Sequence, residues 1–266
     1  MGKDITKIEL GGLDLTQFGI RAVQDGITIE LPPLKGEDRQ IPGITGRLWV
    51  PKDPDGRKVA LRILVSGLTP SSKDGVTLQG RLDQLRKVLT ANGPQLLRLY
   101  MADGSIREGK AEVVSAVEFQ PQGPWAYAAV VELYMADPWF YDPNLQTSQI
   151  STTSVPYTWL VNNPGTVRAE NLVITITATA TNPTLGMADN SVWFRYRGNT
   201  SNAQSLVIDV KNFKATVGGL DVSRNIEHWG DVYWLFLEPG DNTLKFDAAS
   251  LSGTATVKID WNPPYA

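Results

Sequence analysis

His228 is the only histidine of the chain and stands between Glu227 and Trp229, where an imidazole could serve as a general base. Asp231 follows three residues later and offers a carboxylate to orient the ring. Adjacent residues of a strand point to opposite faces, however, and no nucleophile motif such as Gly-x-Ser-x-Gly occurs in the sequence. We therefore expect His228 to lie in a turn or at a strand end, without a catalytic role.

Asp53 and Asp55 beside Gly56 have the composition of a calcium loop. The Ca²⁺ loop of an EF-hand distributes its ligands over about twelve residues and ends in a glutamate, and that spacing is missing here. A hairpin turn explains the same residues better, because Asp and Gly are the residues that tight turns favour.

Asp137 and Asp142 flank the segment Pro138-Trp139-Phe140-Tyr141 and resemble the carboxylate pair of a glycosidase. Such a pair needs carboxyl groups about 5–10 Å apart across a sugar cleft. In an extended segment the two would be too far apart, so we expect them to cap backbone amides. Trp139, Phe140 and Tyr141 would then form an anchor that packs the linker onto a domain or a neighbouring subunit.

The tryptophans of the second half admit two explanations: they fill the core of a β-sandwich, or they stack on sugar rings. Trp234 and Trp261 share their registers with apolar residues, which favours the core. Trp193 alternates out of step with its apolar neighbours and lies beside Arg195. We expect Trp193 and Trp229 to form a surface contact of an outer domain.

The composition excludes many kinds of chemistry. The 266 residues include no cysteine and one histidine, which removes thiolate nucleophiles, cysteine zinc sites, iron–sulfur clusters and multi-histidine metal sites. We expect no catalytic residues, no metal and no cofactor, and hence not an enzyme. With 25 basic and 28 acidic residues, the net charge of -3 gives no basic surface for grasping nucleic acid.

No targeting signal is visible either. The first residues have no apolar h-region, and no apolar run approaches the ~20 residues that a membrane-spanning helix needs. The sequence thus indicates a protein made in a cytoplasm, with no membrane span and no classical export.

Residues 1–145 carry much more charge than residues 146–266, which are richer in Thr, Ser and Asn. The change follows a proline turn at Asp142-Pro143-Asn144, which is typical of a domain boundary. We expect two domains, 1–145 and 146–266. The first has one amphipathic helix, about 77–92, with an apolar stripe and a stop at Asn92-Gly93-Pro94; the stripe comprises Leu78, Leu82, Leu85, Val88 and Leu89.

The rest of the sequence shows the two-residue alternation of β-strands. In the first half we expect strands over 58–65, 95–101, 113–119 and 125–133, which with the helix make a β-barrel or sandwich-like domain. In the second half, alternation and turn residues predict an antiparallel β-sandwich. Its expected strands cover 172–180, 191–196, 205–210, 231–237, 242–246 and 254–261.

Several turn motifs occur in an order that resembles the distal tail proteins of long-tailed, non-contractile phages. The segment Met135–Tyr141 is similar to the one that closes the first domain in that family. The later motifs of the family have similar segments in this sequence, namely Val161–Val167, Asn171–Thr177, Asn182–Thr184 and Leu237–Leu244. At the second of these, Glu170-Asn171 replaces a proline that the family often has. The resemblance spans nearly the whole chain, and the order and spacing of the motifs carry it.

This resemblance implies a structural protein of a siphophage virion. The first domain would form a hexameric ring that joins the tail tube protein to the tail-tip hub protein, with DNA passing through the lumen. The second would be a peripheral sandwich resembling galectins or carbohydrate-binding modules, and receptor-binding or other minor tail proteins would attach around the ring. The segment Leu31–Gly46 would be an arm that reaches a neighbour. An alternative function is a carbohydrate-binding adhesin that contacts host cell-wall glycans.

Overall fold

The computed structural model describes residues 5–17, 20–36, 45, 54–67, 75–231 and 233–266. The chain divides into two compact units, Met1–Tyr141 with Ala266 (unit 1) and Asp142–Tyr265 (unit 2). Each unit has a hydrophobic cluster of its own. The roles expected of residues 1–145 and 146–266, a ring-forming and a peripheral domain, stay predictions.

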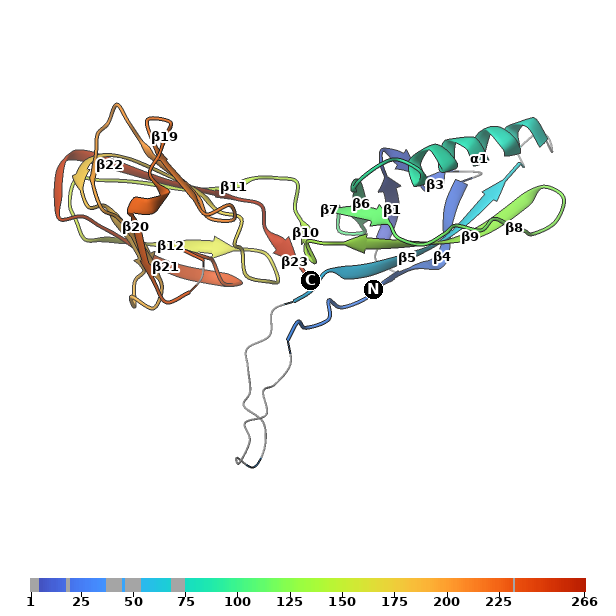
Figure 1. Cartoon of the computed structure of the whole chain (residues 1–266), viewed down its shortest axis with the longest axis horizontal. Coiled ribbons are helices and arrows are strands. Elements are labelled where there is room, and N and C mark those ends of the chain that lie inside the picture. Colours follow the sequence, from blue (N-terminus) through green and yellow to red (C-terminus); the bar gives the residue numbers. More distant parts are fainter. Residues whose placement is uncertain (1–4, 18–19, 37–44, 46–53, 68–74, 232) are drawn as a thin grey trace. The chain divides into compact units, whose positions relative to one another are not determined.

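Unit 1 contains an antiparallel sheet in the order β2-β1-β6-β7-β9-β5-β4-β3 (Figure 1). Its strands are β1 (Ile5–Leu10), β2 (Leu13–Asp14), β3 (Thr16–Gln17), β4 (Ile20–Ile29), β5 (Arg57–Ser66), β6 (Gln95–Met101), β7 (Ile106–Val113) and β9 (Ala126–Met135). Two short strands extend it, with β8 (Gln120–Pro121) on β9 and β10 (Phe140–Tyr141) on β7. The described strands do not close into a barrel, because the path ends at β2 and β3.

One face of this sheet is apolar because burial alternates along its long strands. On β5 and β9 the buried positions are Arg57, Val59, Leu61, Ile63 and Val65, and Ala129, Val131, Leu133 and Met135. Between them, Lys58, Arg62 and Glu132 are exposed on the other face. The alternation predicted from the sequence is thus confirmed for both strands.

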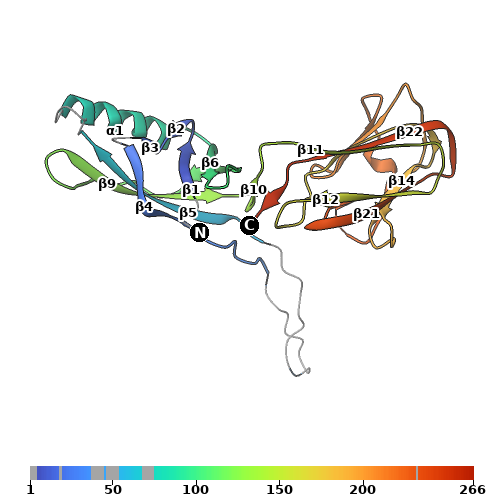
Figure 2. The same ribbon diagram turned by 180° about the vertical axis from the view of Figure 1, so that it is seen from behind.

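The helix α1 (Gly75–Leu89) covers the apolar face, as both views of unit 1 show (Figure 1 and Figure 2). Leu78, Leu82 and Leu85 of its predicted stripe are buried in the core of unit 1. The helix ends at Leu89, three residues before the predicted end. The Thr90 hydroxyl donates to the Arg86 carbonyl at 2.8 Å and the Gln95 side chain to the Val88 carbonyl, so side chains satisfy carbonyls at the helix end.

The predicted strand over 113–119 is wrong, because β7 ends at Val113 and residues 114–119 form no strand. The alternation of this segment has another cause. Val117 and Phe119 pack against the core of unit 1, and the Arg86 guanidinium lies 5.5 Å from the Phe119 ring centroid. Packing without backbone pairing produces the same two-residue pattern here.

Unit 2 is an antiparallel β-sandwich, as the sequence predicts. One sheet has the order β11-β22-β13-β17-β18-β19, with β16 on β13, and the other has the order β12-β21-β14-β15-β20. The first sheet comprises β11 (Gln146–Thr152), β13 (Val173–Thr181), β16 (Asn199–Thr200), β17 (Leu206–Asp209), β18 (Lys214–Val217), β19 (Leu220–Asp221) and β22 (Ser250–Trp261). The second comprises β12 (Tyr157–Asn163), β14 (Thr184–Met187), β15 (Trp193–Tyr196), β20 (Ile226–Trp229) and β21 (Gly240–Asp247).

The inner faces of the two sheets share one core. Ile174, Ile176, Val257 and Ile259 come from the first sheet, and the second contributes Leu185, Phe194, Leu244 and Phe246, all fully buried. Trp234 and Trp261 also belong to this core, which confirms the expectation for both.

The predicted strand over 231–237 is wrong for the described residues of that segment. Residues 234–237 are buried consecutively instead of alternately, and only Leu237 forms an isolated bridge, with Ala169. Arg168 holds this segment: its guanidinium lies 4.4 Å from the Phe236 ring centroid and donates to the Asp231 carboxylate at 3.1 Å. The continuous apolar run therefore fills the sandwich as an irregular segment.

No helix among the described residues is long and apolar enough to cross a lipid bilayer.

Leu85→Ala tests whether α1 stabilises unit 1 through its apolar stripe. Leu85 is fully buried, so we expect the free energy of unfolding to fall by about 2–5 kcal/mol. The exposed neighbour is the control, and Gln84→Ala should stay within about 0.5 kcal/mol of the wild type. Urea denaturation followed by circular dichroism measures both. Equal stabilities for the two variants would contradict the packing of α1.

Candidate functional site

Phe140 lies in the core of unit 1 at 2% exposure. Its strand β10 pairs with β7 through Tyr141 opposite Glu108. The adjacent Gly109 makes room for this packing, since a Cβ there would lie 2.3 Å from Met135 Cε and 3.4 Å from Phe140 Cδ1. The ring of Phe140 is therefore part of the unit 1 core, and the interdomain or assembly role of residues 139–141 stays a prediction.

The aspartates that flank this segment cap backbone amides, as expected. The Asp137 carboxylate accepts hydrogen bonds from the Trp139 amide at 3.3 Å and from the Tyr141 hydroxyl at 2.9 Å. The Asp142 carboxylate accepts one from the Asn144 amide at 2.8 Å. Both carboxyl groups therefore fix local turns.

Arg57 contacts the same segment and was missed in the sequence. Its side chain is 1% exposed, and its Cζ lies 5.7 Å from the Trp139 ring centroid and 5.4 Å from that of Phe140. Burial lowers the pKa of Arg57, and the nearby Asp137 opposes this shift. The signal was present, because Arg57 shares its two-residue register with Val59 and therefore belongs to the buried face of β5.

The other residues considered for catalysis or metal binding are His228, Asp53 and Asp55. His228 is exposed near the end of β20, and the Glu227 carboxylate beside it binds Arg197. Asp55 accepts the Gly56 amide at 2.7 Å and pairs with Lys35 at 2.9 Å, while Asp53 lies outside the described residues. In the part of the chain that the structure describes, no three His, Cys, Asp or Glu residues gather as a metal site.

Trp193 and Trp229 lie directly opposite each other on β15 and β20. Trp229 is 66% exposed, whereas Trp193 is half-buried under the Arg195 guanidinium, whose Cζ lies 5.3 Å from the ring centroid. The structure thus brings the two predicted surface residues together, with Trp229 as the more exposed ring.

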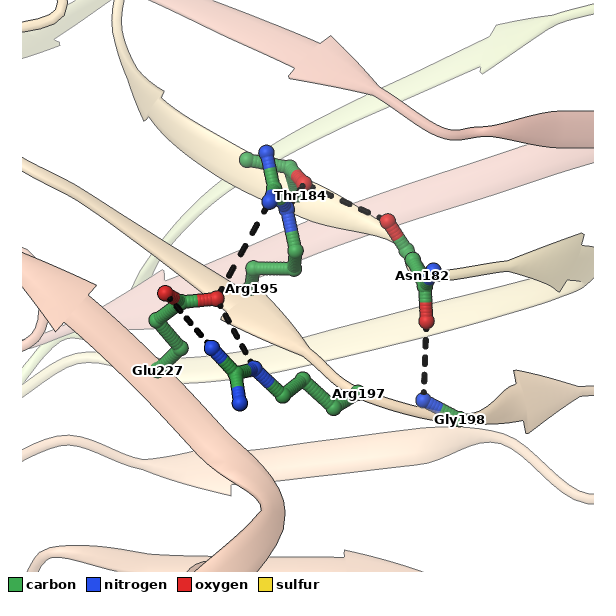
Figure 3. A network of polar contacts seen from close by, with 6 residues as sticks. All are labelled: Asn182, Thr184, Arg195, Arg197, Gly198 and Glu227. Carbon is green, nitrogen blue, oxygen red and sulfur yellow. Dashed lines mark hydrogen bonds and ion pairs between the residues drawn. The ribbon is translucent and has the colours of Figure 1, made fainter.

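Figure 3 shows a network of charged side chains that includes Arg195, the residue whose guanidinium lies over the Trp193 ring. The Glu227 carboxylate accepts hydrogen bonds from Arg197 Nε at 3.0 Å and Nη2 at 2.9 Å, and Arg195 Nη1 lies 3.9 Å from it. Arg195 Nε donates to the Thr184 hydroxyl at 3.1 Å. The hydrogen bonds from Arg197 are the main reason that the pKa of Glu227 is lowered.

The network could not be found from sequence spacing alone. Arg195 and Glu227 are cross-strand partners separated by more than thirty residues, so only the pairing of β15 with β20 brings them together. We call Trp193, Arg195, Arg197, Glu227 and Trp229 the outer-face cluster. The first three alternate along the chain with the buried Phe194 and Tyr196. Trp229 and Glu227 are the cross-strand partners of Trp193 and Arg195.

Comparison with known proteins gives a family match for the second unit. Residues 164–265 match the family model described as the siphovirus-type tail component, C-terminal domain. No curated protein sequence matches the chain significantly.

Solved structures extend the comparison to the whole chain. The crystal structure of SPP1 Dit (gp 19.1), described as a paradigm of hub adsorption apparatus in phages that infect Gram-positive bacteria, is 17% identical with a TM-score of 0.65 and covers 98% of this chain and 99% of its own. The activated phage p2 baseplate with Sr gives 11% identity and a TM-score of 0.41 over 96% of this chain and 97% of that chain. The first likeness shows that both units share the fold of that protein.

Tyr141→Phe tests the stabilising role of the hydrogen bond from the Tyr141 hydroxyl to the Asp137 carboxylate. Loss of the hydroxyl donor leaves a half-buried carboxylate with one fewer hydrogen bond, so we expect a loss of about 1–3 kcal/mol in the free energy of unfolding. Tyr134→Phe is the matched control, since that hydroxyl donates no hydrogen bond within the described residues. Chemical denaturation of both variants provides the measurement, and a Tyr141→Phe protein as stable as the control would disprove the role.

Arg197→Met tests the charge network of the outer-face cluster. The pKa of Glu227 lies below its ordinary value of 4.5, so the network contributes stability above pH 4.5 and loses it as the pH falls through the lowered pKa. Removing Arg197 should raise the pKa toward 4.5 and bring the acid-induced loss to higher pH. NMR titration of the Glu227 carboxyl carbon measures this. Arg224→Met is the control that should leave the titration unchanged, and an unchanged titration in Arg197→Met refutes the pairing.

Proposed function

We propose that this chain is the structural hub at the distal end of a siphophage virion tail, because unit 2 matches a siphovirus-type tail component family and both units share the fold of SPP1 Dit. In this role, six copies form a ring that continues the tail tube and carries the proteins of the tail tip. The chain would then be a virion component that acts through its surfaces.

The observation that carries the proposal is the extent of the likeness. The family match covers unit 2, from residue 164 to residue 265, while the shared fold includes unit 1 as well, with its helix-covered sheet. A hub needs both a body that assembles and a domain that receives other proteins. We assign the first task to unit 1 and the second to unit 2, the two compact units of the chain.

The uncovered face of the unit 1 sheet supports assembly. Opposite the helix, β5 and β9 expose Lys58, Arg62 and Glu132 beside Val130, which is 52% exposed. Val114, 49% exposed, is hydrogen-bonded through its amide to the Glu132 carbonyl at 3.1 Å and adds a second apolar side chain. A closed ring requires two different complementary surfaces on each subunit, and exposed apolar residues among charges are suited to such a contact.

The partners follow from the position of the hub. The tail tube protein binds one side of the ring, the tail-tip hub protein binds the other, and receptor-binding or other minor tail proteins attach around it. DNA passes through the lumen without specific binding, because a chain with a net charge of -3 does not hold phosphates electrostatically. No catalytic step is part of this function, and incubation with purified bacterial cell wall should release no soluble fragments.

Light scattering and negative-stain microscopy test the ring directly. Over a concentration series, alone and with purified tail tube protein, we expect particles of about six times the 29.1 kDa chain mass with sixfold views. Trp229→Ala, which changes only an exposed side chain of unit 2, should assemble as the wild type does. A chain that stays monomeric at high concentration, with no rings alone or with tube protein, would overturn the hub proposal.

A further inference from the structure

We propose that the outer-face cluster of unit 2 binds an acidic saccharide, with Trp229 stacking on the sugar ring and Arg195 and Arg197 donating to its carboxylate or phosphate groups. This activity goes beyond the structural role of a hub, since it would let the outer sheet of each subunit contact a glycan directly. The inference stands on the described side chains of β14, β15 and β20.

The aromatic part of the site consists of two tryptophans that are cross-strand partners. Trp229 lies on β20, which ends the order of its sheet, and is 66% exposed. Trp193 lies opposite it, and Gly186 pairs with Trp193 on the other side. A Cβ at Gly186 would lie 2.4 Å from Trp193 Cβ, so a residue with a side chain does not fit opposite Trp193 without a shift of the strand.

The polar part of the site is held in position before any ligand arrives. The Glu227 carboxylate accepts hydrogen bonds from Nε and Nη2 of Arg197, and the Thr184 hydroxyl accepts one from Nε of Arg195 (Figure 3). Each guanidinium has five N–H donors, so both retain donors that find no acceptor among the described residues. The Arg195 side chain is 45% exposed and that of Arg197 is 68% exposed. The remaining N–H donors of both guanidinium groups are therefore accessible to solvent.

Charge selects an anionic ligand. The cluster holds two guanidinium groups and one carboxylate, an excess of one positive charge, whereas residues 146–266 as a whole carry 8 basic and 10 acidic residues. A local positive charge on an otherwise negative half of the chain attracts an anionic group to this face. Arginine suits carboxylates and phosphates in particular, because its planar fork donates two parallel hydrogen bonds.

The same features favour a saccharide over a protein partner. Arginine and tryptophan also occur often in protein interfaces, but covering this cluster with a dry protein surface would desolvate three charges at once. A sugar chain remains hydrated, offers C–H faces to an exposed indole, and satisfies charged donors with its hydroxyl and acidic groups. The exposed, charged and aromatic face therefore matches the chemistry of an acidic glycan.

A glycan array tests the site with the full-length chain. The array pairs galacturonic acid, mannuronic acid and phosphorylated mannose oligomers with neutral galactose and mannose oligomers of the same length. We expect binding to at least one acidic oligomer, weakened by added salt, and much weaker binding to its neutral counterpart. Trp229→Ala and Arg197→Met should each weaken binding about tenfold or more.

Leu220→Ala is the matched control, because Leu220 is 74% exposed on β19 of the other sheet and should leave binding unchanged. Circular dichroism of each variant verifies that the sandwich stays folded. Binding to no saccharide on the array overturns the proposal, as does binding that survives both cluster variants. Attachment of a purified minor tail protein that Trp229→Ala abolishes, without saccharide binding, would assign the face to a protein instead. Ring assembly is measured separately, so the hub proposal stands or fails on its own result.

Discussion

Each sheet of this protein buries a single face, and the packing of both units follows from that burial. Strand residues alternate between two faces, and this sequence places most of its large apolar side chains on one of them. In unit 1 the apolar face is covered by α1, and in unit 2 the two sheets cover each other. The opposite faces remain for contact with other molecules, and both proposed activities of the protein use them.

The fold was largely predictable because alternation is a local property. Strands such as β6 follow from the sequence, and the stripe of α1 follows from its spacing. The failures have physical causes: Val117 and Phe119 alternate through packing alone, and residues 234–237 are buried in succession. A two-residue pattern indicates which side chains are buried, whereas backbone pairing depends on the neighbouring strand.

The candidate site could be predicted only in part for a related reason. An unusual residue type marks Trp193 and Trp229 in the sequence, but their partners Arg195 and Glu227 meet only through the register of β15 and β20. Arg57 shows the converse case. Its place in an apolar alternation indicates burial, yet only the folded chain brings it to the rings of Trp139 and Phe140. Long-range pairing, which a single sequence does not specify, decides both sites.

We propose that this chain lies at the distal end of a virion tail, where its surfaces contact other tail proteins. Electron cryomicroscopy of the intact virion would locate the chain directly. We expect a sixfold ring between tube and tip whose density accommodates unit 1 and unit 2 of each copy. Density for the chain elsewhere in the particle, or a distal ring that fits neither unit, would contradict this placement.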